Sequence, residues 1–160
     1  MSVTTAQETV SATITVAASA ARVVAVLADA TTHAAIDGTG WVREAPDPAP
    51  LAEVGQLFRM DMYHSARAVG DYQVVNKVVV FDAPNAIGWL TGYEKPDGEL
   101  AFGGWVWRYD LTPRGTAEVE VTLTYDWSAA PQDVRDRISF PPFGPDHLAN
   151  SLRHLATLAA

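Results

Sequence analysis

The organisation of the chain can be inferred outward from residues 104–127, which have the sequence GWVWRYDLTPRGTAEVEVTLTYDW. Apolar and polar side chains alternate before and after a turn at Pro113-Arg114-Gly115. Alternation is typical of strands, and one apolar face opposite one polar face is typical of an antiparallel sheet. The stretch therefore predicts two antiparallel strands. The apolar residues of the second strand, expected on the covered face of the sheet, are Val119, Val121, Leu123, Tyr125 and Trp127.

More strands are predicted towards the N-terminus of this stretch. Residues 56–64 alternate, residues 72–81 are rich in valine, and residues 86–94 follow a turn at Pro84-Asn85. Val10 to Val16 also alternates, whereas residues 1–8 are expected to form a ragged end. The full set of earlier strands is then expected at 10–16, 41–44 (short), 56–64, 72–81 and 86–94.

Helices are predicted on both sides of this run of strands. Ser19 can cap a helix that starts at Ala20, and residues 32–36 fit a second short helix. After Pro145, leucines recur at helical spacing from Leu148 to Leu158. Consecutive strands bounded by helices define an α+β fold, and 160 residues fit one domain spanning 1–160.

Composition narrows the function classes. The chain has no cysteine, which excludes disulfides, thiol nucleophiles and cysteine metal sites. Its formal net charge is −8, with 11 basic against 19 acidic residues, which argues against nucleic acid or an anionic membrane as partner. We found no apolar run long enough to cross a membrane and no signal-peptide pattern. A cytoplasmic protein without membrane insertion is therefore expected.

The covered face of the predicted sheet carries many large rings and two methionines. Rings of this size opposite a helix hold the two layers apart, which favours a cavity for a small hydrophobic or aromatic ligand. A dry, filled core is the alternative interpretation. The residues predicted to line the cavity are Phe58, Met60, Met62, Trp89, Tyr93, Trp105, Trp107, Tyr109 and Tyr125 from the strands, with Leu148 and Leu152 from the helix.

The order of elements and several segments resemble the START-related, birch-pollen-allergen-like helix-grip family. The likeness is to its actinobacterial polyketide cyclase/dehydrase and lipid-transport branch, and the turn DAPNAIGW at 82–89 is its most telling part. It implies a curved sheet of about six to seven strands around a long C-terminal helix, with a ligand cavity between them. The segments are GQLFRMDMYH (55–64), VVVFDAPNAIGWL (78–90), GGWVWRYDLTPRG (103–115), VEVTLTYDWS (119–128) and FPPFGPDHLANSLRHLATL (140–158).

Two polar residues on the covered face are candidates for chemistry. His64 ends the alternating strand, where an imidazole near a cavity mouth can act as general acid or base. It could equally bond a loop carbonyl or water. Asn76 lies among valines, and a buried amide needs a hydrogen-bond partner. That partner is either a ligand carbonyl or enolate, or a neighbouring tyrosine or tryptophan.

Other polar motifs favour structural roles. His147 and His154 share a stripe beside the leucines of the last helix, expected to face solvent and too far apart to share one metal ion. Gly103-Gly104 is expected to permit a bulge. Neither a metal nor a cofactor is expected.

Three functions remain open. A cyclase or dehydratase could act on an aromatic acyl or polyketide substrate, with His64 moving the proton and Asn76 stabilising an enolate. A non-catalytic carrier of lipids or metabolites needs only the cavity and a gate, for which residues 46–50, 65–71 and 140–143 are candidates. An interaction domain that uses the acidic outer face is the weaker reading.

Overall fold

A curved antiparallel sheet is the central element of the computed structural model, which describes residues 2–6, 8–46, 49–63 and 71–160, with side chains from residue 8 onwards. Its strand order is β1-β2-β7-β6-β5-β4-β3, and every neighbouring pair is antiparallel. The strands are β1 (Ser2–Ala6), β2 (Thr9–Val16), β3 (Leu57–Tyr63), β4 (Asp71–Asp82), β5 (Ala86–Glu94), β6 (Leu100–Pro113) and β7 (Val119–Asp126).

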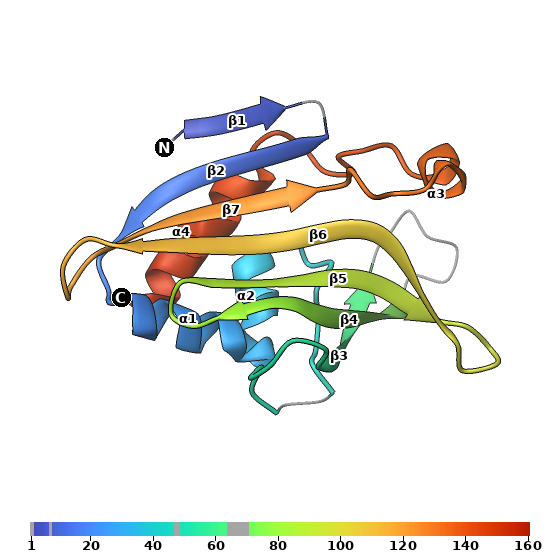
Figure 1. Ribbon diagram of the computed structural model, residues 1–160, viewed down its shortest axis with the longest axis horizontal. Coiled ribbons are helices and arrows are strands. Elements are labelled where there is room, and N and C mark those ends of the chain that lie inside the picture. The colour runs from blue at the N-terminus through green and yellow to red at the C-terminus, as the bar shows by residue number, and fades with distance from the viewer. Residues whose placement is uncertain (1, 7, 47–48, 64–70) are drawn as a thin grey trace.

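Three α-helices gather on one face of this sheet (Figure 1): α1 (Ala20–Ala28), α2 (His33–Asp37) and α4 (His147–Ala159). A 3-10 turn at Ala30–Thr32 joins the first two, and α4 contacts β2, β7, α1 and α2. The short α3 (Gln132–Arg137) follows β7. The predicted α+β class and helix-grip arrangement are thereby confirmed. None of the helices in the described residues combines the length and hydrophobicity that crossing a membrane requires.

The core follows the predicted alternation. Along β7, buried and half-buried residues alternate without interruption, with Val119, Val121 and Leu123 enclosed. On α4, Leu152 and Leu155 have no exposed surface. The two apolar faces therefore meet, as the sequence periods predict.

The N-terminal prediction was wrong. Residues 2–6 are not a ragged end but strand β1, which pairs with β2 from Ser2↔Thr13 to Ala6↔Thr9. Backbone pairing needs only the free N–H and C=O groups of an edge strand, so a weakly apolar segment can form it.

The short strand expected at 41–44 is reduced to an isolated bridge between Val42 and Met62. Backbone bonds from Arg43 N to Asp61 O (2.8 Å) and from Tyr63 N to Trp41 O (2.7 Å) flank the bridge. This segment covers part of the free edge of β3 and brings Trp41 to the inner side of the sheet.

Candidate functional site

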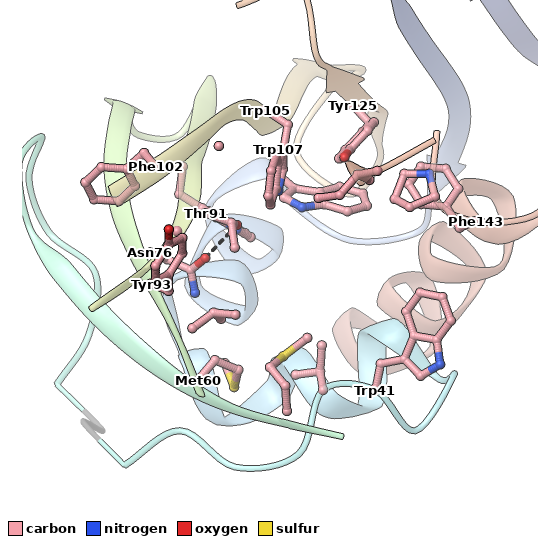
Figure 2. Close-up of a pocket in the computed structure, with 18 of the residues that line it drawn as sticks. Trp41, Met60, Asn76, Thr91, Tyr93, Phe102, Trp105, Trp107, Tyr125 and Phe143 are labelled. Atoms are coloured by element: carbon pink, nitrogen blue, oxygen red, sulfur yellow. Dashed lines mark hydrogen bonds between the residues drawn. The ribbon is translucent and has the colours of Figure 1, made fainter. Parts of the chain in front are cut away.

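A cavity of about 760 Å³ lies between the inner face of the sheet and the helices. Strands β3 to β7 supply most of its wall, and the helices, the segment after α3 and the segment with Trp41 and Val42 contribute to the rest. Figure 2 shows Trp41, Met60, Trp107 and Phe143 around its central space. The lining is mainly aromatic and aliphatic, which suits an apolar ligand.

Most of the side chains predicted to bind a ligand are brought together here. Tyr93 is 48% exposed and stands at the rim, whereas Tyr109 and Tyr125 are buried in the wall. The predicted residues that line the cavity are Met60, Met62, Trp89, Tyr93, Trp105, Trp107, Tyr109 and Tyr125, together with Asn76.

Three predicted ligand contacts lie elsewhere. Phe58 is 1% exposed and packs edge-on against Trp89, which places its ring behind the cavity wall. Leu148 and Leu152 belong to the hydrophobic core and are not among the lining residues. Leucine periodicity identified the buried face of α4, but not which part of that face meets open space. The candidate acid–base residue His64 lies outside the described residues.

Asn76 presents its amide group at the cavity wall. The Thr91 hydroxyl donates a hydrogen bond of 2.7 Å to Asn76 Oδ1, the bond drawn in Figure 2. No residue in the described ranges accepts from Nδ2, and no fully enclosed side-chain nitrogen or oxygen there lacks a partner. Nδ2 is therefore not enclosed, and it faces the cavity as a hydrogen-bond donor.

Aromatic rings from the segment after α3 close one side of the cavity. Phe143 lies 5.0 Å from Tyr125 and 5.6 Å from Trp107, measured between ring centroids. Phe140 stacks on Trp127 at 6.0 Å with the planes inclined by only 10°. This segment, one of the predicted gates, is thus held to β6 and β7 by ring contacts.

The Gly103-Gly104 pair forms the predicted bulge. Gly104 has a φ of 87°, and pairing of β5 with β6 shifts register between Leu90 and Gly92. A Cβ on Gly103 would lie 1.8 Å from the Trp105 ring. The absence of a side chain at Gly103 therefore lets Trp105 fold back and line the cavity.

His33 is a buried lining residue that the sequence reasoning missed. Its Nε2 donates to the Leu27 carbonyl at 2.8 Å, so in the neutral ring Nδ1 keeps its lone pair. Burial lowers the pKa of His33, outweighing the opposing effects of this hydrogen bond and of Asp29. His33 is therefore neutral near pH 7.

The expectation that His147 and His154 face solvent was wrong for His147, which α2 largely covers, whereas His154 is exposed as predicted. His154 Nδ1 lies 2.9 Å from the Ile36 carbonyl oxygen, and His147 Nε2 lies 3.6 Å from Asp37 Oδ1. The side chains of Asp37 and His147 are only 13% and 10% exposed, and both line the cavity. The stripe itself was visible in the sequence, but its covering by a helix over 110 residues earlier in the chain was not.

The site joins few ionisable groups to many rings. Burial raises the pKa of Tyr125, and burial together with the nearby Asp37 carboxylate raises that of Tyr109. Both phenols are therefore neutral hydrogen-bonding groups. Within the described ranges, no three histidine or carboxylate side chains are grouped as a metal site would need. The arrangement can hold a ring-bearing molecule and offer it a few directed hydrogen bonds.

Comparison with solved structures places the fold among known proteins. Protein Ms6760 from Mycobacterium smegmatis has a TM-score of 0.70 at 15% identity, over 99% of this chain and 96% of that chain. A protein from Arthrobacter aurescens gives 0.69 at 13%, over 99% and 90%. Major latex-like protein 151 from Panax ginseng gives 0.62 at 12%, over 94% and 96%.

These identities show the fold alone. No family model matches the chain, and no curated protein does. The neighbours are consistent with the helix-grip fold that the sequence resembles.

Proposed function

We propose that this protein binds a small hydrophobic or aromatic molecule in the cavity between the sheet and α4. The supporting observation is the cavity itself, about 760 Å³ in volume and walled chiefly by aromatic and aliphatic side chains. Volumes and linings of this kind suit a drug-sized apolar ligand. Met60 and Met62 add deformable surface that can adjust to its shape.

In this proposal Asn76 orients the ligand. Its Oδ1 already accepts from Thr91, which leaves Nδ2 to donate to a carbonyl or similar oxygen of the ligand. In a mainly apolar wall, a directed donor fixes orientation more than it adds affinity. The same donor would stabilise an enolate oxygen.

That donor is the observation that favours a second candidate function, cyclase- or dehydratase-type chemistry on a polyketide-like substrate. The residue proposed to move the proton, His64, lies outside the described residues. A non-catalytic carrier of lipids or aromatic metabolites needs only the cavity and an entrance. The segment with Phe140 and Phe143 is the proposed entrance, since it covers the cavity through ring contacts rather than through strand pairing.

The test is a fluorescence titration with N-phenyl-1-naphthylamine. Ser151→Phe places a ring in the cavity, because Ser151 is 4% exposed and lines it. Asn150→Phe, one residue away on the exposed side of α4, is the matched control. Binding by the wild type and the control, with affinity reduced about ten-fold or more in Ser151→Phe, supports the proposal. Absence of binding by the wild type contradicts it.

Native mass spectrometry separates the carrier from the enzyme. Protein isolated from cell extract is examined for a bound small molecule, and that molecule is then incubated with fresh protein. An unchanged mass after incubation favours the carrier, and a changed mass favours the enzyme.

A further inference from the structure

We propose that Asp37 and His147 form a hydrogen-bond acceptor site for a hydroxyl group carried on an aromatic ring of the ligand, as in a phenol or naphthol. The inference rests on the proposed function, since it assumes that a small aromatic molecule enters the cavity. It adds a second polar position on the cavity wall, made by α2 and α4 rather than by the strand that carries Asn76.

The first step is the geometry of the pair. His147 Nε2 lies 3.6 Å from Asp37 Oδ1, and both side chains are nearly enclosed. The other carboxylate oxygen, Oδ2, accepts from the backbone N–H of Thr39 at 3.1 Å and from the Thr39 hydroxyl. These two donors occupy Oδ2, so Oδ1 is the oxygen that Asp37 presents to His147 at the cavity wall.

The second step is the protonation state of His147. Burial lowers its pKa most, and His154 on the same helix lowers it further, whereas Asp37 from α2 raises it without compensating. From β6, the phenol of Tyr109 also lies near Asp37, whose carboxylate helps to raise the Tyr109 pKa and keep the phenol neutral. A neutral imidazole carries one N–H and one lone pair. The carboxylate favours the proton on Nε2, which faces Oδ1, and Nδ1 is then an acceptor.

That acceptor is available to a ligand. No residue among the described ranges donates to His147 Nδ1, and no fully enclosed side-chain nitrogen or oxygen there is without a partner. Nδ1 is therefore not enclosed, in a side chain that lines the cavity. A hydroxyl group on the ligand would donate its proton to this nitrogen.

The third step concerns the rings around the pair. They favour a hydroxyl group that is attached to an aromatic ring of the ligand. The His147 ring is 4.8 Å from Phe143 and 6.0 Å from Trp107, between ring centroids. A planar ligand can pack against these rings while its hydroxyl meets the pair. A carboxylate in the same place would be repelled by Asp37. Figure 2 shows Asn76 and Phe143 on opposite sides of the cavity, so donor and acceptor positions are separated.

The experiment compares three ligands of nearly equal shape by displacement of N-phenyl-1-naphthylamine. 2-Naphthol offers a donor, 2-methoxynaphthalene offers only an acceptor, and 2-methylnaphthalene offers neither. A hydrogen bond to this pair is expected to make 2-naphthol bind about ten-fold tighter than the other two. His147→Phe and Asp37→Asn are each expected to remove that preference. The control is His154→Phe, the same substitution two turns further along α4 in a side chain that is not part of the cavity lining.

Each outcome decides the proposal. A preference for 2-naphthol that is lost in His147→Phe and in Asp37→Asn, but kept in His154→Phe, supports it. Should either of the first two variants fail to give a cooperative melting transition, the other decides. Equal binding of the three ligands by the wild type overturns the acceptor site and leaves the proposed function standing. A preference that survives both substitutions also overturns it. Failure of all three ligands and the fluorophore to bind contradicts the proposed function itself.

Discussion

The imidazole of His33 stacks on the indole of Trp89, with ring centroids 5.0 Å apart and planes inclined by 15°. Phe58 meets both rings edge-on, at 5.8 Å from His33 and 5.6 Å from Trp89. The histidine also donates a hydrogen bond to the Leu27 carbonyl at the end of α1. A titratable ring is therefore used here as a packing element between the helices and β5.

This packing predicts that stability depends on pH through His33. Its pKa is lowered in the folded protein, so the unfolded chain binds the proton more readily. The stabilising contribution is complete above the unfolded pKa of about 6.5, and it decreases as the pH falls below that value. Between the two pKa values the loss is at most about 1.4 kcal/mol per pH unit. Urea unfolding at about pH 8 and about pH 5 measures it.

The control is His33→Phe, which keeps a ring against Trp89 but cannot donate to Leu27. Its unfolding free energy at high pH should be about 1–3 kcal/mol lower than that of the wild type, because a buried carbonyl loses its donor. The difference between the two proteins should shrink at low pH. A constant difference across the pH range would show that His33 titrates alike in the folded and unfolded states.

Gly103→Ala tests how Trp105 is held. The added Cβ would lie 1.8 Å from the indole ring, so the ring must move. We expect a loss of about 1–3 kcal/mol in unfolding free energy. The near-ultraviolet circular dichroism of the tryptophans should also change. Gly144→Ala is the control, since no atom lies within 4 Å of the position of its Cβ, and it should stay within about 0.5 kcal/mol of the wild type. Similar effects of both substitutions would count against the packing described for Trp105.

The contact between α2 and α4 predicts non-additive mutations. Gly38 ends α2 with a φ of 68°, and a Cβ there would lie 2.3 Å from the His154 ring. Gly38→Ala therefore carries both backbone strain and a clash, together about 2 kcal/mol or more. His154→Ala removes the clash but also the contact with the Ile36 carbonyl. In a double-mutant cycle by urea unfolding, the double variant should be less destabilised than the sum of the single ones. Strict additivity would mean that the two residues do not meet.

Leu152→Ala tests whether this leucine contributes to the stability of the core but not to ligand binding in the cavity. The side chain has no exposed surface and does not line the cavity, so its truncation should cost about 2–5 kcal/mol of unfolding free energy. The affinity of the folded variant for N-phenyl-1-naphthylamine should stay close to that of the wild type. Thermal unfolding and the same fluorescence titration measure both quantities. Weakened binding in a folded Leu152→Ala protein would indicate that this leucine contacts the ligand, as predicted from the sequence.

Strand alternation and leucine spacing predicted the layers of this fold well, because both periods depend on local geometry. The alternation in β7 is preserved residue by residue, and the leucines of α4 are buried. The cavity wall of β3, β5 and β6 followed from the same parity. Phe58 has that parity too, yet it lies behind the wall, since parity gives the face of a strand and not the depth of a side chain.

The polar part of the site was harder to predict, because it depends on contacts between distant segments. Asn76 stood out as an amide among valines. Asp37 and His147 come close to each other only because α2 packs beside α4, and the sequence of neither helix predicts that packing. Similarly, the composition of β1 does not predict a strand, and its pairing with β2 is what identifies it as one.

The pairing of β2 with β7 has a consequence for how the chain folds. The hydroxyls of Thr13 and Thr122 meet at 2.9 Å although they are 109 positions apart in the sequence. Contacts of such separation require a large loop to close before they stabilise anything, and proteins dominated by them fold slowly. During synthesis, β2 has no partner on that side until β7 has left the ribosome. For that interval its backbone is open to pairing with other chains, which makes this strand the place to expect chaperone contact or early aggregation.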